Sequence, residues 1–423
     1  NASSRSRESL RERDVDETQD GGSFPARLAK DKPVDRPISA ATARLYELWD
    51  AQQDRTNPFY TTFQYSPVTG IGRDDRVPVS RRDPSKVLKI DDLYHVWYTR
   101  RITSVPPVGM DRFEEADEQI PAVDWDLADI CHATSSNGFD WKEQGVAVPR
   151  APQGNYGDRS LSTPDILVWE GKFWLYYQCF TTRWRENDCV SVSAAWADSA
   201  WGPWTRVDRP VVMRGGPDEW DGCAIHDPFP LVYRGQIWLY YKGTPVDRPP
   251  ENLRLAQGVA VADHPAGPFV KSPLNPVTNS GHETMLWPWR GGIAALLSLD
   301  GPEKNTVQFA EDGLNFVPRA HVTMPPQAPG PFCPDAFADK GDGQGVRWGL
   351  AHINPEGGGG ENGCHLIRFD CNLCDAERPE FQKSNILYHE GTWLQRVLAL
   401  SPERKARILA QQAIVDRQTI LGP

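Results

Sequence analysis

Five acidic residues each stand directly before an apolar run, and the five motifs recur at intervals of about 50 to 80 residues. Hydrolysis of a glycosidic bond requires two acidic groups at a fixed separation, one to activate a water molecule and one to protonate the leaving oxygen. A fold that gathers the repeated acids in one place would therefore suit chemistry on a sugar linkage. The acids are Asp83, Asp165, Asp227, Glu283 and Asp335.

The residues that follow each acid predict the strands that would position it. Short runs rich in β-branched and aromatic residues are separated by turns, as in residues 166–169 and 173–177 on either side of Gly171, and such pairs are typical of β-hairpins. The same pattern predicts hairpins at 87–98, 231–241, 285–297 and 336–348. A second hairpin, marked by a turn followed by an aromatic residue, is predicted at 136–141, 200–204, 264–269 and 311–316.

About four strands per repeat are typical of a propeller blade. We therefore predict an all-β fold, a five-bladed β-propeller in which the innermost strand of every blade starts at its acid. All five acids would then lie at one mouth of the central channel. The first interval is the longest, and we place the extra residues in an insertion around 106–121.

The composition agrees with a large, turn-rich β protein and excludes several classes of function. The chain has 423 residues, with 16 Trp, 37 Pro and 35 Gly. Its formal net charge of −11 argues against a nucleic-acid partner. No run approaches the roughly 18 apolar residues of a membrane span. The same charge does not argue against a neutral sugar, so an oligosaccharide substrate stays open, and we expect neither nucleic acid nor membrane as partner.

Two arms flank the predicted propeller of residues 66–385. The N-terminal arm, residues 1–65, begins with a polar stretch and continues into a predicted helix at 39–50. An apolar helix face beside a loose arm favours exchange of the arm between the subunits of a homodimer. The C-terminal extension, 386–423, contains a second predicted helix at 401–414. The first helix has Ser39 as its expected N-cap and Leu45, Tyr46, Leu48 and Trp49 as apolar positions.

The eight cysteines are dispersed, and only Cys371 and Cys374 have a spacing found in zinc sites, without a second pair to complete one. We predict no dedicated metal site and no required cofactor, although a ring of acids could hold a divalent cation in the central channel. The chain starts without Met and without a hydrophobic signal region, which favours a periplasmic or secreted protein whose signal was removed. Disulfides could form in that compartment.

Several longer motifs, in the same order along the chain, resemble glycoside hydrolase family 117, the α-1,3-(3,6-anhydro-L-galactosidases) or neoagarobiose hydrolases. The likeness extends from about residue 40 to about residue 320, and the last blade and the C-terminal arm match less distinctly. The motifs that carry it are 57–67, 80–87 with 94–101, 226–229, and 275–283 with 301–306.

The resemblance implies a five-bladed propeller and a dimer that exchanges its N-terminal arms. It also implies exo-acting, inverting hydrolysis that releases 3,6-anhydro-L-galactose from the non-reducing end of neoagaro-oligosaccharides during agar degradation. By the same resemblance Asp83 is the catalytic base, His282 is the catalytic acid, and Asp227 is a further catalytic residue that supports the reaction.

The residues themselves are consistent with an acid and a base but leave the acid open. Positive neighbours such as Arg82 would favour the ionised, basic form of Asp83. His282 and Glu283 are adjacent, and successive strand residues point to opposite faces, so only one is expected to address the channel. A histidine can donate a proton near neutral pH, whereas related propeller glycosidases with an Asp, Asp, Glu set would nominate Glu283. With the resemblance we favour His282, and Glu283 then binds sugar hydroxyls.

Other side chains near the mouth are predicted to bind substrate. An acid there could hold the sugar or shift the pKa of a neighbouring acid, and an aromatic ring could stack on a sugar face. A non-catalytic propeller that binds carbohydrate is the alternative, since propellers host unrelated functions; a relative acting on another galactan-type linkage is the third. The predicted substrate-binding residues are Glu283, Asp165, Arg82, Trp97, Trp125, Thr163 and His226, with Trp287 and Trp289 as further aromatic candidates.

Overall fold

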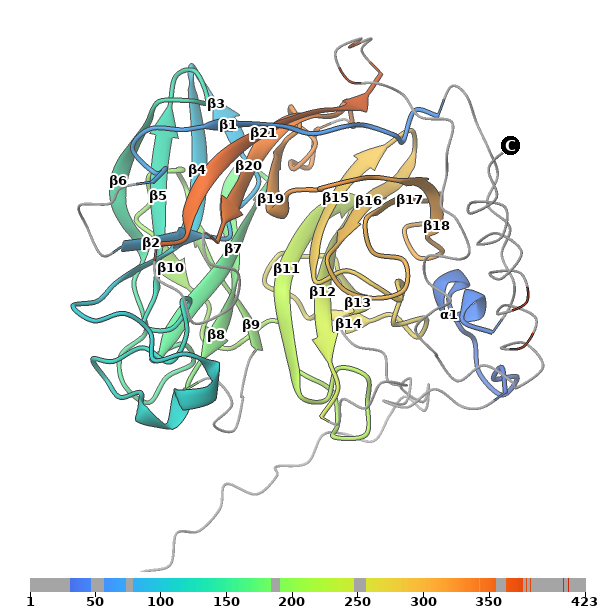
Figure 1. The fold of residues 1–423 in the computed structure, drawn as a ribbon, viewed down its shortest axis with the longest axis horizontal. Coiled ribbons are helices and arrows are strands. Elements are labelled where there is room, and N and C mark those ends of the chain that lie inside the picture. The colour runs from blue at the N-terminus through green and yellow to red at the C-terminus, as the bar shows by residue number, and fades with distance from the viewer. Residues whose placement is uncertain are drawn as a thin grey trace, which may run out of the picture.

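The computed structural model describes residues 31–46, 57–73, 79–183, 191–246, 256–341, 343–354 and 363–375, together with 378, 381, 406 and 410. Within them, five antiparallel sheets surround a common centre (Figure 1). The chain is therefore the predicted all-β, five-bladed β-propeller. No helix in this described part is long and apolar enough to cross a membrane.

The first four blades follow one another along the chain, and each begins with its innermost strand. Blade 1 contains β2 (Val79–Arg82) and β3 (Leu88–Ile90), which both pair with β4 (Leu93–Ile102), then β5 (Asp129–Ser135) and β6 (Trp141–Val148). Blade 2 contains β7 (Ser160–Trp169), β8 (Lys172–Phe180), β9 (Ser191–Ala197) and β10 (Thr205–Arg206). Blade 3 contains β11 (Ala224–Tyr233), β12 (Gln236–Thr244), β13 (Ala256–Ala262) and β14 (Val270–Lys271). Blade 4 contains β15 (Glu283–Trp289), β16 (Gly292–Ser298), β17 (Thr306–Ala310) and β18 (Val317–His321).

The fifth blade joins the two ends of the propeller. Its first three strands are β19 (Gln327–Phe332), β20 (Gly345–Ile353) and β21 (His365–Cys374), and its outermost strand is β1 (Gln64–Pro67) from the other end of the chain. Pairing of β1 with β21 closes the ring with backbone hydrogen bonds. The domain boundary predicted between residues 65 and 66 therefore falls inside β1.

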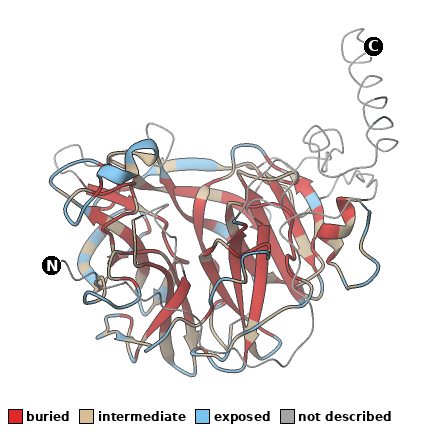
Figure 2. Cartoon of the chain, turned by 90° about the horizontal axis from the view of Figure 1, so that it is seen from below, coloured by how far each residue is buried: buried red, intermediate tan, exposed pale blue. Residues whose placement is uncertain are grey.

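The hairpins form where short apolar strands meet tight turns. Trp169 pairs with Lys172 across Glu170 and Gly171, which both have positive φ, and such residues favour the two-residue turns of β-hairpins. The second hairpins also form as predicted, as at 136–141, where β5 ends and β6 begins. Figure 2 shows that the strands are mostly buried, while exposed residues gather in the loops. This packing makes the inner strands a rigid support for side chains at the mouth.

The insertion predicted around 106–121 connects β4 to β5 and contains the 3₁₀ helix η1 (Met110–Glu115). Arg159, just before β7, pairs with Asp126 through Nε and Oδ1 at 2.8 Å, and donates a further hydrogen bond to the backbone carbonyl of Asp117. These contacts tie the insertion to blade 2. The insertion thereby brings Asp124 and Trp125 beside the start of the innermost strands.

The N-terminal helix α1 (Ala40–Arg44) begins at Ser39, whose hydroxyl accepts a hydrogen bond from the backbone N–H of Thr42. The predicted N-cap is confirmed. The rest of the predicted helix, including Leu48 and Trp49, lies outside the described residues, as does the C-terminal helix at 401–414 apart from residues 406 and 410, which are helical.

The position predicted for Asp335 is wrong. The innermost strand of blade 5 is β19, which precedes Asp335 instead of following it. Asp335 is exposed and lies in a turn where Ala338 pairs with Val168, near the end of β7 that is remote from its start. Asp335 is therefore at the opposite end of the channel from the starts of the inner strands. The seven cysteines in the described residues are all free thiols, so the disulfides considered from the sequence are not present among them.

Candidate active site

Four inner strands share one backbone irregularity near their starts. Asp83, Thr163, Asp227 and Ala328 each precede a proline and have φ of 50°, 49°, 49° and 44°. At three of these positions the strand register shifts as in a β-bulge, and Asp83 lies in the break between β2 and β3. A residue with a Cβ is strained in this left-handed region, so surrounding contacts must hold it there.

The shared irregularity defines which residues of different blades are equivalent. Thr163, rather than Asp165, corresponds to Asp83 in blade 2, and Ala328, rather than Asp335, corresponds to it in blade 5. Blade 4 starts directly with Glu283 in β15. Acidic side chains therefore occupy the start of the inner strand in blades 1, 3 and 4 alone among the described blades, a narrower set than the five predicted from the sequence.

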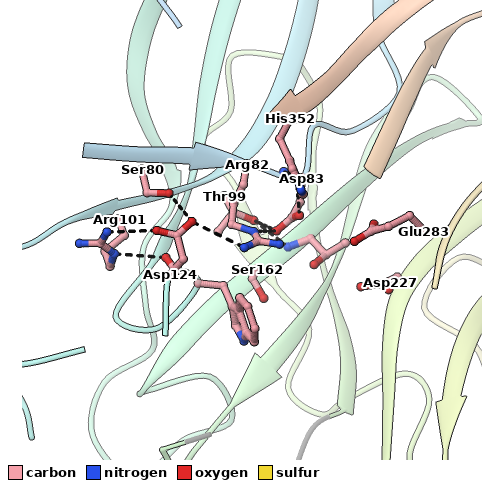
Figure 3. Close-up of polar contacts among 12 residues, drawn as sticks. Ser80, Arg82, Asp83, Thr99, Arg101, Asp124, Ser162, Asp227, Glu283 and His352 are labelled. Carbon is pink, nitrogen blue, oxygen red and sulfur yellow. Dashed lines mark hydrogen bonds and ion pairs between the residues drawn. The ribbon is translucent and has the colours of Figure 1, made fainter. Parts of the chain in front are cut away.

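Asp83 is almost fully buried, and three side chains surround its carboxylate (Figure 3). Arg82 Nε donates to Oδ2 at 2.9 Å, and the Thr99 hydroxyl donates to the same oxygen at 3.2 Å. His352 Nδ1, on β20 of blade 5, lies 3.2 Å from Oδ1. His352 was not identified from the sequence, because nothing in its local pattern relates it to a residue 269 positions away.

These neighbours decide the ionisation of Asp83. Burial by itself raises the pKa of the carboxyl, but the positive charge of Arg82 and the hydrogen bond that Arg82 donates outweigh burial and hold the pKa well below its ordinary value. Asp83 is therefore a carboxylate throughout the neutral range, the form that can accept a proton from water.

A second carboxylate fixes Arg82 from the other side. Asp124 Oδ2 lies 3.6 Å from an Arg82 Nη atom and accepts a hydrogen bond from the Ser80 hydroxyl at 2.6 Å. Fully buried Arg101 pairs with Asp124 Oδ1 at 3.1 Å. The Arg82 guanidinium also lies 4.8 Å from the centre of the Trp125 ring. Asp124 was missed in the sequence because it belongs to the insertion and precedes no strand.

Asp227 and Glu283 come from the neighbouring inner strands β11 and β15 (Figure 3). Lys242 Nζ lies 2.5 Å from Asp227 Oδ2, and the backbone N–H of Asp227 donates to Gln178 Oε1 at 2.9 Å. Glu283 is nearly buried, and its Oε1 lies 3.9 Å from His282 Nε2. The sequence prediction that these two acids lie at the same mouth as Asp83 is consistent with their places at the starts of inner strands.

His282 lies directly before β15, and its side chain is 38% exposed. Its Nδ1 is 2.9 Å from Asp300 Oδ2, and the hydrogen bond from His282 is the main cause that lowers the pKa of Asp300. A histidine held by a carboxylate at Nδ1 presents Nε2 to the other side, where it can donate a proton. Asp300, in the turn after β16, is a residue that sequence reasoning missed.

Asp165 follows the bulge residue Thr163 by two positions along β7, and it forms a buried ion pair with Lys86. Lys86 Nζ is 2.5 Å from Asp165 Oδ2, and the backbone N–H of Lys86 donates to Oδ1 at 2.9 Å. Burial removes water from both charged groups, so it lowers the pKa of Lys86 to about 8 and raises the pKa of Asp165, although their mutual attraction opposes both shifts. The arrangement gives Asp165 a structural contact between blades 1 and 2, and the predicted role in binding substrate has no open carboxylate oxygen to support it.

Burial separates the aromatic candidates into core residues and one residue that is accessible at the mouth. Trp97 is fully buried and stacks on His132 at 4.9 Å between ring centres, and Trp287 and Trp289 are also core residues. The prediction that Trp97 stacks on a sugar is therefore wrong, because no face of its ring is accessible. Trp125, in contrast, is partly exposed beside Arg82.

The two remaining substrate-binding candidates lie at the mouth. Thr163 is a bulge residue whose N–H donates to the Thr99 hydroxyl at 2.8 Å, and His226 directly precedes the bulge residue Asp227; both are partly exposed. In the described residues no three His, Cys, Asp or Glu side chains gather closely enough to hold a metal ion. The divalent cation considered from the sequence stays an untested prediction.

Comparison with solved structures places the chain in a family. Zg3597, a family 117 glycoside hydrolase from the marine bacterium Zobellia galactanivorans, is 42% identical to this chain and superimposes with a TM-score of 0.71. The match covers 81% of this chain and 99% of Zg3597. The chain belongs to glycoside hydrolase family 117. It is a glycoside hydrolase, and the non-catalytic binding propeller is set aside.

Other likenesses within the solved structures show the fold alone. A protein described only as a glycoside hydrolase is 12% identical, with a TM-score of 0.50, and the match covers 73% of this chain and 92% of that protein. No family model matches the chain, and no curated protein sequence is similar to it. Membership of family 117 therefore rests on the similarity to Zg3597, which agrees with the resemblance of the motifs.

Proposed function

We propose that this family 117 enzyme is an exo-acting, inverting α-1,3-(3,6-anhydro-L-galactosidase) that releases 3,6-anhydro-L-galactose from the non-reducing end of neoagaro-oligosaccharides. The observation that carries the proposal is the pairing of two groups at one mouth. One is Asp83, a carboxylate kept ionised by Arg82, and the other is His282, whose Nδ1 lies 2.9 Å from Asp300 Oδ2 and whose Nε2 is on the other side of the ring. The sugar itself is inferred from the resemblance of the motifs to the family.

In the proposed mechanism Asp83 acts as general base. Its Oδ2 accepts hydrogen bonds from Arg82 and Thr99, and Oδ1 faces His352, so the carboxylate is fixed before the substrate arrives. It removes a proton from a water molecule as that water attacks the anomeric carbon, and inversion follows because the water enters opposite the leaving group.

His282 acts as general acid in the same step. Asp300 stabilises the protonated ring through Nδ1, and Nε2 delivers the proton to the glycosidic oxygen as the bond breaks. Glu283 lies within 3.9 Å of Nε2 and binds sugar hydroxyls near the acid. Asp227, paired with Lys242, supports the reaction from the neighbouring strand β11.

The proposal is tested by incubating the enzyme with neoagarobiose and measuring released 3,6-anhydro-L-galactose. We expect release by the wild type, and a loss of about 10²–10⁴ in turnover for Asp83→Asn, which keeps the shape of the side chain but cannot accept the proton. NMR of the first product anomer should show inversion. Release from another galactan oligosaccharide, with none from neoagarobiose, would assign a different linkage.

We also propose that the enzyme is a homodimer that exchanges its N-terminal arms. In the single chain α1 packs on its own blades: the Ser39 hydroxyl donates to the Pro276 carbonyl at 2.7 Å, and Arg44 forms a buried ion pair with Glu303 at 2.7 Å. An exchanged arm makes the same contacts with the partner instead of its own chain. The contacts of α1 therefore identify a binding surface for the arm on blades 3 and 4, whether the arm comes from the same chain or from the partner subunit.

A further inference from the structure

The second strands of four blades carry a polar side chain at one equivalent position. In the strand pairing, Thr99 lies opposite Arg82, Gln178 opposite Ser162, Lys242 opposite His226, and His352 opposite Gln327. In each case the opposite residue directly precedes the left-handed residue before proline in the same blade. The four side chains therefore lie at the same level along the channel axis, close to the mouth.

Three of these side chains hold the bulge of the next blade. Asp83 N–H, in blade 1, lies 3.2 Å from His352 Nδ1 of blade 5, and Thr163 N–H, in blade 2, donates to the Thr99 hydroxyl of blade 1 at 2.8 Å. Asp227 N–H, in blade 3, donates to Gln178 Oε1 of blade 2 at 2.9 Å. The same contact thus recurs at three consecutive blade boundaries.

The contact is needed because the strand ladder is interrupted at these residues. The register steps from Ser162 to Asp165 and from His226 to Phe229, so no opposite strand residue pairs with the bulge. A buried N–H without an acceptor is costly. His352, Thr99 and Gln178 are themselves buried, so they supply a fixed acceptor from the neighbouring blade.

We propose that His352 and Gln178 are positioning residues, which aim the side chains of Asp83 and Asp227 by accepting the backbone N–H of each. This inference rests on the proposed function of the two aspartates. Thr99 links two of these bulges, since its hydroxyl accepts from Thr163 N–H and donates to Asp83 Oδ2. Misplacement of a reacting group by about 1 Å can reduce a rate by roughly 100-fold, so such contacts affect catalysis.

The recurrence assigns the state of the His352 ring. Nδ1 lies 3.2 Å from both the backbone nitrogen and Oδ1 of Asp83, and a proton on Nδ1 would point to the carboxylate and leave the N–H without an acceptor. The equivalent atoms of Thr99 and Gln178 are acceptors. His352 therefore carries its proton on Nε2 and accepts at Nδ1, a task that a glutamine oxygen performs in blade 2.

The test exchanges acceptors between blades. We expect His352→Leu and Gln178→Leu to lower kcat on neoagarobiose by about 10- to 100-fold with KM little changed. His352→Gln and Gln178→His keep an acceptor and should stay within about threefold of the wild type. Gln144→Leu is the matched control, because Gln144 donates to Thr134 on the outer strands of blade 1 and makes no contact with the bulges of the inner strands.

Hydrogen exchange of the Asp83 and Asp227 amides gives a readout that needs no substrate. Each of the two residues is followed by a proline, which has no N–H, so one fewer neighbouring amide contributes to a short peptide that spans it. We expect faster exchange at Asp83 in His352→Leu and at Asp227 in Gln178→Leu, with near wild-type exchange in the two acceptor variants. If one leucine variant does not fold, the kinetics and amide exchange of the other leucine variant still test the positioning role.

The outcomes separate this inference from the proposed function. Loss of activity in His352→Gln as large as in His352→Leu, or unchanged amide exchange in both leucine variants, would overturn the positioning role. A wild type that releases nothing from neoagarobiose would reject the proposed substrate, and amide exchange would still decide whether the side chains hold the bulges.

Discussion

At the scale of single residues, Asp83 acquires its chemistry from its neighbours. Burial alone would keep the carboxyl protonated to a higher pH, and Arg82 is the main cause that reverses this effect. Arg82 is itself held between Asp83 and Asp124, so its charge is compensated on both sides. The site is therefore a chain of alternating buried charges, from Arg101 through Asp124 and Arg82 to Asp83.

The ionisation of Asp83 predicts the acidic side of the pH profile. Because its pKa lies below the ordinary value of about 3.9, the wild-type kcat/KM should not fall on the acidic side until the pH is below that value. Arg82→Gln removes the favourable charge, so the pKa of Asp83 should rise and the acidic limb should move to higher pH. Steady-state kinetics across pH measure this, with Arg112→Gln on the exposed insertion as control. An acidic limb unmoved in Arg82→Gln would contradict the assignment of Asp83 as the base.

The identity of the acid is decided by the alkaline side of the same profile. His282→Ala should lower turnover by about 10²–10⁴ and abolish the alkaline limb, because the group that must be protonated is gone. Glu283→Gln should reduce turnover less and weaken binding more. If Glu283→Gln abolishes the alkaline limb and His282→Ala retains it, the acid is Glu283.

At the scale of the elements, the bulged inner strands and the second strands act together. Four inner strands bring one residue to the mouth in a strained conformation. For Asp83, Thr163 and Asp227, the side chain that binds the backbone N–H of this residue belongs to the preceding blade. Deeper in the channel, the same blades are joined by the Lys86–Asp165 pair, where Lys86 Nζ also donates to the Pro230 carbonyl at 2.8 Å and lies 4.1 Å from the Phe229 ring centre. The pair connects blades 1, 2 and 3 beneath the mouth.

Breaking the Lys86–Asp165 pair should destabilise the propeller. Lys86→Met leaves a buried carboxylate without its partner, which costs about 3–5 kcal/mol, whereas the double variant Lys86→Met with Asp165→Leu removes both charges and should recover much of that loss. Chemical denaturation of the two single variants and the double variant measures the coupling. Additive effects of the two substitutions would show that the ion pair is not a unit.

At the scale of the whole molecule, two segments from the N-terminal part of the chain complete the propeller. Strand β1 supplies the last strand of blade 5, and α1 packs beside blades 3 and 4, where Leu45 is buried. The connection between them, residues 47–56, is not described. Closure of the ring and docking of the arm are thus separate contributions of the same region.

Exchange of the arm predicts a change of assembly on truncation. Deletion of residues 1–55 removes α1 but keeps β1, so the propeller should fold and the dimer should become a monomer in light scattering. Arg44→Ala should weaken the dimer, since it leaves Glu303 buried without its partner, and exposed Asp35→Ala is the control. An unchanged dimer after the deletion would reject arm exchange.

The sequence by itself determined the repeating hairpins, and with them the five blades. Short runs of β-branched and aromatic residues and turn residues such as Gly171 are local signals, so they can be interpreted without knowing what packs against them. The long motifs around Asp83 and His282 likewise identified the family, which the similarity to Zg3597 confirms. The insertion of blade 1 and the N-cap at Ser39 were also predictable from local pattern.

Only the tertiary structure decided which residues of different blades are equivalent and which side chains meet. Asp165 and Thr163 are two residues apart, and a bulge places Thr163 instead of Asp165 in the position of Asp83. Trp97 was predicted at the mouth and is core, because the packing of blades 1 and 2 covers both of its faces. His352, Asp124 and Asp300 meet their partners across long separations or in loops, where no local periodicity relates the two residues.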